Sequence, residues 1–132
     1  MEKEITNEEL IEKARAVVKP KEMRHGFTSA DCGAVLVTDK GNVYLGVSID
    51  TPSSMGFCSE HSAIAAMVTN GEYNIKTIVA VDGAGLVLPP CGRCREFMYQ
   101  IDKDNLNTDV LVAKDRVVKL RDLLPYPWDE TL

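Results

Sequence analysis

Three cysteines and one glutamate have the residue types and the spacings of a metal centre. The segment CSEH places Glu60 two residues after Cys58, and the later segment PPCGRCRE holds Cys91 and Cys94. Positions i and i+3 of a helix share one face, so Cys91 and Cys94 can bind the same ion. Cys58 and this pair each begin an expected helix, where the helix dipole favours thiolates. Together they predict three ligands for one zinc ion.

Glu60 is expected to act on a water molecule at the metal instead of on the metal itself. A catalytic zinc site leaves its fourth position open to water, whose pKa the ion lowers to about 7. Glu60 is too near Cys58 in sequence to be an easy second ligand, and it can carry the proton of that water. A closed structural site would need a further Cys or His. Cys32 lies in an apolar segment and is expected to be a buried core thiol, and His25 beside a glycine is expected at the surface.

Two alternatives compete with a catalytic zinc site. A C-x-x-C pair by itself fits a redox protein as well as a metal site. The third cysteine, the glutamate that follows it at position 60, and the proline before Cys91 favour the metal. The other alternative is a zinc-binding regulatory protein without catalytic activity. Glu60 argues against it, because such a protein needs no residue to move protons.

Periodic apolar patterns and turn residues predict alternating helices and strands. We expect helices over 5–19, 58–71, 91–101 and, as a short element, 120–124, and strands over 32–49 (a hairpin with the turn TDKGN), 75–83 and 108–113. Thr6 and Glu9 have the spacing of a capping box at the first helix. The long linkers 19–31 and 50–57 are candidate walls of a site. A single sheet covered by helices accommodates this order.

Length and composition indicate one soluble globular domain, residues 1–132. The chain has 45% apolar and 27% charged residues. Its net charge is -5 and it has no basic run, which argues against nucleic acid as a partner. No apolar stretch approaches the roughly 18 residues of a membrane span, and the acidic N-terminus lacks the core of a signal peptide. We therefore expect a cytoplasmic protein without a membrane partner, in a compartment where disulfides are rare.

The segments CSE and PCGRC resemble the zinc-binding signature of the cytidine deaminase superfamily, in which a C/H-x-E motif precedes P-C-x-x-C. The resemblance covers nearly the whole chain and is strongest to the small three-cysteine branch that acts on free nucleosides. It implies a three-layer α/β/α sandwich with a mixed sheet of about five strands, assembled as a homotetramer or a homodimer. It also implies one Zn²⁺ per chain and hydrolysis of the 4-amino group of a cytosine nucleoside, as in pyrimidine salvage.

Two families within this branch remain open, cytidine deaminase and blasticidin S deaminase. The residues GRC between the ligands and the ending LLPYPW look closer to the second. Several positions depart from the first: Ala30 replaces an aromatic residue, Ser48 and Asp50 replace the N-x-E that binds ribose, His61 replaces an arginine, and Glu96 replaces a glutamine. The resemblance assigns substrate contacts to Ser48, Asp50, Ser59 and Pro89. Trp128 is a candidate wall of a reshaped pocket.

Three residues beside the ligands can balance the charge of the centre. Three thiolates and Zn²⁺ leave one net negative charge, which weakens the metal as a Lewis acid, and a donor to thiolate sulfur offsets this charge. Arg93 lies between two ligands, and Arg95 is a further candidate. His61 either donates to a sulfur or is a buried neutral residue. The alternative for both arginines is a place in solvent or at an interface.

Overall fold

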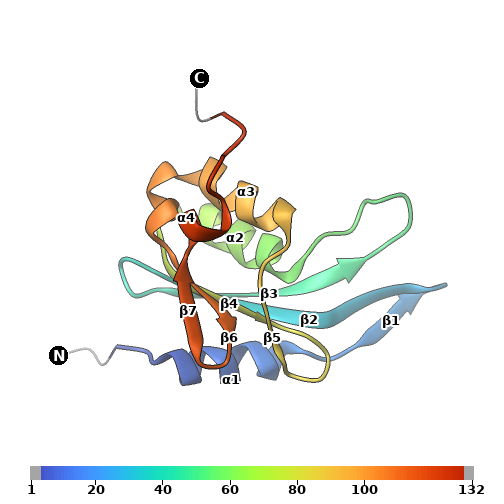
Figure 1. Cartoon of the computed structure of the whole chain (residues 1–132). Helices are drawn as coiled ribbons and strands as arrows, with labels where there is room; N and C mark the ends of the chain where they lie inside the picture. Colours follow the sequence, from blue (N-terminus) through green and yellow to red (C-terminus); the bar gives the residue numbers. More distant parts are fainter. Residues whose placement is uncertain (1–3, 130–132) are drawn as a thin grey trace.

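The computed structural model describes residues 4–129 and has helices on both faces of one sheet (Figure 1). Helix α1 (Asn7–Val17) covers one face. The other face carries α2 (Ser59–Thr69), α3 (Gly92–Ile101) and the short α4 (Leu120–Leu123), with a 3-10 turn, η1 (Lys103–Asn107), after α3. The expected three-layer arrangement is confirmed. No helix within residues 4–129 has the length and apolar character needed to cross a membrane.

The sheet has seven strands, of which five form the main path. In chain order they are β1 (Lys21–Arg24), β2 (Phe27–Thr38), β3 (Val43–Asp50), β4 (Ile75–Val81), β5 (Val87–Leu88), β6 (Asp109–Ala113) and β7 (Arg116–Lys119). Strand β2 lies between β3 and β4, β4 pairs with β6, and β6 pairs with β7. Only the β4–β6 pair is parallel among the described strands, so the sheet is mixed as expected. The short strands β1 and β5 add to β2 and β4.

The expected linker 19–31 is instead part of a β-hairpin, which corrects the prediction. Strand β1 pairs with the first residues of β2 through a turn at His25 and Gly26, whose φ angles are 30° and 82°. All four side chains of β1 are exposed. The segment therefore lacks the alternating apolar pattern from which a strand can be recognised. The hairpin extends away from the body of the molecule, beside the loop that follows β3 (Figure 1).

Two apolar clusters hold the three layers together. On the α1 face, the buried side chains are Leu10, Ile11, Ala14, Val35, Val37, Val79, Val81 and Leu111. On the other face they are Leu36, Ala63, Ile64, Met67, Ile75, Ile78, Met98, Val110 and Leu120. Successive side chains of β2 alternate between the two clusters, as the pleat of a strand requires. The capping of α1 is also confirmed, because the Thr6 hydroxyl accepts from the Glu9 amide at 3.1 Å.

A glycine in β3 lets α2 lie directly on the sheet. A Cβ atom at Gly46 would stand 2.3 Å from the Ala63 nitrogen and 2.5 Å from the Ser59 carbonyl oxygen. Only a residue without a side chain permits this approach of helix and strand. The contact fixes the first turn of α2, which carries Glu60, against β3.

The position of α3 is fixed by one buried amide side chain. Asn105 in η1 donates to the carbonyl oxygens of Met98 and Tyr73, at 2.9 and 3.0 Å, and accepts from the Ile75 amide at 2.8 Å. The side chain is fully buried, so losing one of these partners would leave an unsatisfied polar group. Asn105 thereby ties the end of α3 to the start of β4.

Candidate metal and substrate site

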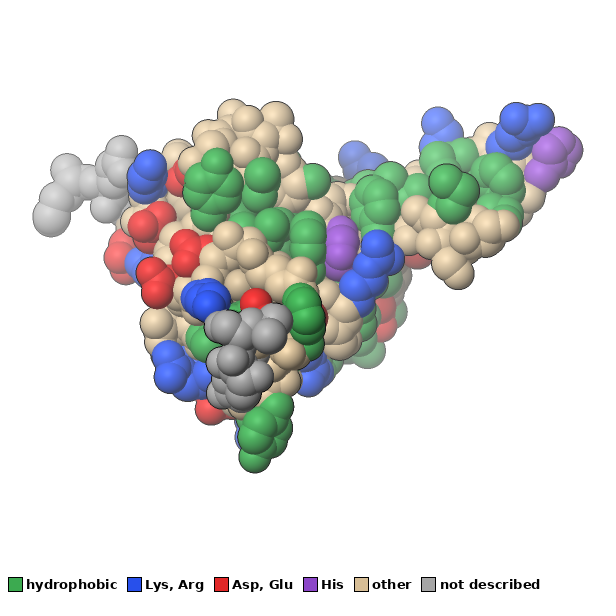
Figure 2. Space-filling view, turned by 90° about the horizontal axis from the view of Figure 1, so that it is seen from above, with side chains coloured by type: hydrophobic (Ala, Val, Ile, Leu, Met, Phe, Trp, Pro, Cys, Tyr) green, Lys and Arg blue, Asp and Glu red, His purple; other side chains and the backbone are tan. Residues whose placement is uncertain are grey.

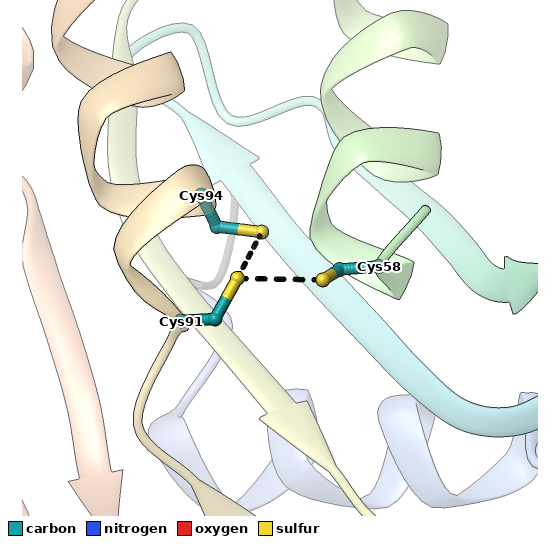
Figure 3. A group of neighbouring side chains, drawn as sticks. All are labelled: Cys58, Cys91 and Cys94. Carbon is teal, nitrogen blue, oxygen red and sulfur yellow. Dashed lines mark hydrogen bonds between the residues drawn. The ribbon is translucent and has the colours of Figure 1, made fainter. Parts of the chain in front are cut away.

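The three predicted ligands converge from the first residues of two helices (Figure 3). Cys58 is the N-cap residue of α2 and Cys91 is the N-cap residue of α3, while Cys94 lies in the first turn of α3. Their sulfur atoms all lie within 4.8 Å of one another, with 3.4 Å between Cys58 and Cys91 and 3.6 Å between Cys91 and Cys94. A tetrahedral zinc with Zn–S bonds of about 2.3 Å holds its sulfurs about 3.8 Å apart. The three cysteines therefore fit one zinc ion.

Burial and mutual proximity shift the pKa values of the three thiols in different directions. Burial, followed by the hydrogen bond with Cys91, raises the pKa of Cys58 to about 11. Burial and the field of Glu60 also raise the pKa of Cys94. The pKa of Cys91 is lowered, because the backbone amides of Cys94 and Arg93 and the two neighbouring thiols outweigh its burial. Three thiolates this close are stable only beside a positive ion, and a divalent metal supplies that charge.

Glu60 is buried beside the sulfurs without belonging to their group. Its side chain is only 6% exposed, and one of its oxygens accepts from the Ser59 hydroxyl at 3.2 Å. Burial raises the pKa of Glu60, and its own backbone amide and the Ser59 hydroxyl oppose that effect. A carboxyl group with a raised pKa gains and loses a proton closer to neutral pH, which is what a general acid and base requires.

A cavity of about 420 Å³ opens over these residues. Its lining consists of Asp31, Cys32, Ser48, Ile49, Asp50, Gly56, Phe57, Cys58, Ser59, Glu60, Ala80, Leu88, Pro89, Cys91 and Arg93. The volume lies within the range of small-molecule sites, about 300–1,000 Å³. The structure thus brings Ser48, Asp50, Ser59 and Pro89 to the same cavity as the sulfurs and Glu60. Both segments predicted to form walls contribute, Asp31 from 19–31 and Phe57 from 50–57.

Cys32 is not a core thiol, which corrects the prediction. It is half-buried and lines the cavity, and its backbone amide donates to the Ser48 hydroxyl at 3.0 Å. The cause is a bulge in β2. Pairing with β3 shifts between Ser29 and Gly33, and Ala30 has a φ of 62°. The bulge interrupts the regular alternation of side chains, so the apolar pattern of the segment does not report where Cys32 lies.

His61 lies against one of the three sulfurs. Its Nδ1 is 3.2 Å from the Cys94 sulfur, and its ring stacks on Phe97 with 4.2 Å between centroids and 6° between planes. Burial, and then the positive charge of Arg93, lowers the pKa of His61. A neutral imidazole can still donate its N–H to a thiolate.

The arginines donate to backbone carbonyl groups. Nη1 of Arg93 is 3.5 Å from the Gly56 oxygen, so this side chain joins α3 to the loop after β3. Arg95 donates from Nε to the Pro90 oxygen at 2.8 Å and from Nη1 to the Leu123 oxygen at 3.3 Å. The hydrogen bonds of Arg95 thus hold the chain just before Cys91, in place of the expected contact with sulfur.

Trp128 does not line the cavity of its own chain, which corrects the prediction of a wall. Its side chain is 66% exposed, and its backbone amide donates to the Glu96 carboxylate at 3.2 Å. This bond holds the C-terminal segment against α3. Sequence reasoning also did not single out Asp31, Ile49, Phe57 or Leu88, which line the cavity. The only signal in the sequence for these residues was that Asp31 and Phe57 lie in the segments predicted as walls.

Comparisons with known proteins agree with this geometry. Residues 5–108 match the family described as the cytidine and deoxycytidylate deaminase zinc-binding region. The chain is 34% identical over 94 residues to the cytidine deaminase of Mycobacterium tuberculosis, which covers 70% of this chain and 68% of that protein. It is 36% identical over 67 residues to a probable cytidine deaminase of Dictyostelium discoideum, covering 49% of this chain and 46% of that protein.

Solved structures show the same fold. The crystal structure of cytidine deaminase from Burkholderia pseudomallei has a TM-score of 0.73 at 27% identity, covering 94% of this chain and 100% of that chain. That of Mycobacterium tuberculosis has a TM-score of 0.78 at 25% identity, covering 94% and 98%. With the family match over most of its length and three cysteine sulfurs placed to bind one zinc ion, this chain belongs to the cytidine and deoxycytidylate deaminase family.

Proposed function

We propose that this protein is a zinc-dependent hydrolase that releases ammonia from the 4-amino group of a cytosine nucleoside, cytidine or deoxycytidine. The observation that carries the proposal is that three cysteine sulfurs and one buried carboxyl group meet in a single cavity. Cys58, Cys91 and Cys94 would hold the metal. Zinc, when bound there, supplies a water molecule that is acidic enough to react near neutral pH.

Glu60 provides the proton transfers. It accepts the proton that water loses on adding to C4 of the ring and passes it to ring N3. It then takes the remaining proton from the oxygen on C4, as the carbonyl group forms, and gives it to the departing amine. Its burial serves this role, because a carboxyl group that is poorly solvated holds a proton more readily than an exposed one. The Ser59 hydroxyl keeps the carboxyl group in place through its donated hydrogen bond.

The walls of the cavity supply the binding groups. Ser59 and Pro89 are proposed to hold the amide edge of the ring, and Ser48 and Asp50 the sugar. The Ser48 hydroxyl accepts from the Cys32 amide, so its own hydrogen is available to a substrate oxygen. The apolar side chains of Ile49, Phe57 and Leu88 offer contact surface to the flat ring.

The residues around the ligands adjust the charge of the centre. We propose that His61 donates to the Cys94 sulfur and so withdraws charge from that thiolate, which keeps the metal an effective Lewis acid. Arg93 adds a positive charge at the edge of the same cavity. Arg95 acts indirectly, by fixing the chain before Cys91.

A homotetramer or homodimer is proposed as the working assembly. The hairpin of β1 and β2 and the loop 51–57 project from the body as an arm that carries apolar and basic side chains (Figure 2). Met23 is 46% exposed and Met55 is 78% exposed on these two segments. Exposed apolar side chains grouped on a projecting element are typical of a surface that packs against a partner. Light scattering of the purified protein would give the mass of the assembly.

The proposed activity is tested by a panel of substrates. Zinc-loaded protein is incubated with cytidine, deoxycytidine, cytosine, blasticidin S and adenosine, and ammonia release is measured. We expect the highest kcat/KM with a cytosine nucleoside and no release from adenosine. Metal analysis should find one zinc per chain that survives mild oxidation. If none of the cytosine compounds releases ammonia from protein that holds one zinc, the proposed function is wrong.

A further inference from the structure

The cavity over the sulfurs has an acidic lining. Among its described residues, Asp31, Asp50 and Glu60 are acidic, and Arg93 is the one basic side chain. The balance is negative before the metal centre is counted. Three thiolates around a divalent ion add one further negative charge. A ligand in this cavity is therefore surrounded by negative potential, which low-dielectric walls concentrate.

The bulge in β2 places Asp31 in this lining. Ala30 adopts a φ of 62°, a conformation that residues other than glycine rarely adopt, and the register with β3 shifts immediately after Ser29. Asp31 follows at once and is held there, because the Thr28 hydroxyl donates to its Oδ2 at 3.1 Å. Thr28 is also the register partner of Asp50 on β3. The two aspartates therefore come from adjacent strands at the same end of the sheet.

The thiol of Cys32 reports how closely these acidic groups gather. Its pKa is raised first by burial and then by the negative charges of Glu60, Asp82, Asp31 and Asp50. One side chain on the cavity wall is thus influenced by four carboxylates.

The acidic lining belongs to a site with a defined floor and an open rim. Ser59 and Glu60 are buried, with 1% and 6% exposure, whereas Asp31 is half-buried and Asp50 is exposed. A cytosine ring that presents C4 to Glu60 directs the substituent on N1 the opposite way, because C4 and N1 lie across the ring from each other. That substituent then lies toward the rim, where the two aspartates are.

We propose that Asp31, together with Asp50, is a specificity determinant that selects cytosine nucleosides with a positively charged group on the sugar, accepts neutral ones less well, and rejects phosphorylated ones. The inference rests on the proposed deamination and names the substrate class within it. A cation near two carboxylates gains Coulomb energy that a hydroxyl does not, and a phosphate is repelled. Because the rim is partly solvated, the expected preference for the cation is about five- to tenfold, and the discrimination against phosphate at least about tenfold.

Three probes that differ at one position test the proposal. They are cytidine, 5′-amino-5′-deoxycytidine and cytidine 5′-monophosphate, which carry a hydroxyl, an ammonium and a phosphate group at the same carbon. We expect kcat/KM of the zinc-loaded protein to fall in the order amino compound, cytidine, monophosphate. The differences should lie mainly in KM, and they should shrink as salt is raised, because screening weakens exposed charges.

Substitutions assign the effect to the aspartates. Asp31→Asn should reduce the ratio of kcat/KM for the amino compound over cytidine by about threefold or more, whereas Asp31→Glu, which keeps the charge, should retain it. If the bulge does not tolerate Asn at position 31, Asp50→Asn provides the same test on the neighbouring strand. Asp115→Asn, in the turn between β6 and β7, removes an equal charge from a residue that does not line the cavity, and it should leave the ratio unchanged.

The outcomes separate this inference from the proposed function. If cytidine is deaminated but the amino compound is no better a substrate, or if neither Asp31→Asn nor Asp50→Asn lowers the ratio, the selection by charge is overturned. If none of the three probes releases ammonia while one zinc per chain is bound, the deaminase proposal fails instead.

Discussion

Two buried glutamates lie at opposite ends of α2 and behave in opposite ways. Glu60 stands in the first turn of the helix, and Glu72 follows its last residues. Their exposure is nearly the same, 6% and 7%. Yet the pKa of Glu60 is raised, and the pKa of Glu72 is lowered. Surface exposure alone therefore does not decide the pKa of a carboxyl group, because its depth in the protein and its hydrogen-bond donors also count.

Glu60 lies deeper in the protein than Glu72, and the donors that surround each carboxylate also differ. Glu72 accepts from the hydroxyls of Tyr44 and Thr38 at 2.6 and 2.7 Å and from the Asn42 amide at 2.9 Å. The bond from Tyr44, followed by that from Thr38, lowers its pKa. Glu60 has the Ser59 hydroxyl at 3.2 Å, and its burial prevails. Glu72 is thus fixed as an anion that ties the β2–β3 turn to α2, whereas Glu60 keeps its affinity for protons.

The largest expected effect comes from removing a ligand of the metal site, which lies at the end of α2 that carries Glu60. Cys94→Ser should reduce bound zinc well below one per chain and abolish measurable turnover, because one of three thiolate ligands is lost and metal binding is coupled to folding. Cys91→Ser should do the same. The matched control is Cys32→Ser, which changes a cavity thiol outside the sulfur group and should keep one zinc. Unchanged zinc content and melting temperature in both ligand variants would contradict a shared site.

A second substitution shifts the end of α2 that carries Glu60 without replacing Glu60 or any of the three cysteines. Gly46→Ala would place a Cβ atom 2.3 Å from the Ala63 nitrogen. Overpacking of this kind costs about 1–3 kcal/mol of stability, and here it should also lower kcat because α2 must shift. Gly92→Ala, whose Cβ would meet nothing within 4 Å, is the control in chemical denaturation. Equal stability of the two variants would show that α2 does not rest on Gly46.

The two glutamates should also differ in their contribution to stability. In zinc-free protein, Glu72→Gln should lower the melting temperature, because the amide replaces an acceptor of three hydrogen bonds with a group that is itself partly a donor. Glu60→Gln should leave it unchanged or raise it, since a poorly solvated carboxyl group is removed. Calorimetry of both variants measures the contrast. A lower melting temperature for Glu60→Gln than for Glu72→Gln would contradict the expectation that Glu72, and not Glu60, stabilises the fold.

The smallest effect is the pH dependence that Glu72 contributes. Because its folded-state pKa is lowered, its stabilisation is fully present above the ordinary glutamate pKa and is lost as pH falls through the lower, folded-state value. The wild type should therefore lose more stability between neutral and acidic pH than Glu72→Gln does. Urea midpoints of the two proteins across that range measure the difference. Parallel curves would mean that Glu72 is not held as an anion.

The metal centre could be predicted from sequence because its determinants are local. Cys58 and Glu60 are neighbours, Cys91 and Cys94 share one helical turn, and both groups begin helices that apolar patterns reveal. The order of the helices and of most strands along the chain followed from the same patterns. Hairpin residues 21–24 were missed because every side chain there is exposed.

Features that depend on irregular backbone or distant partners were not predictable. Asp31 and Cys32 reach the cavity through a bulge at Ala30, and no propensity announces a positive φ at an alanine. The donors to Glu72 lie on the β2–β3 hairpin, 28 to 34 residues away along the chain. Trp128 was predicted only as a candidate wall of a reshaped pocket, and the bond from its backbone amide to Glu96 ties its segment to α3 instead. In each case the deciding contact is tertiary and leaves no periodic trace in the sequence.

The most direct measurement compares Glu60→Gln with Glu72→Gln in zinc content and in ammonia release from cytidine. Both variants should bind one zinc per chain, because neither glutamate is a ligand. Glu60→Gln should lose at least about 100-fold in kcat through the loss of general acid and base catalysis, whereas Glu72→Gln should turn over near the wild-type rate. A Glu60→Gln protein that holds its zinc and deaminates cytidine as fast as the wild type would contradict the assigned role.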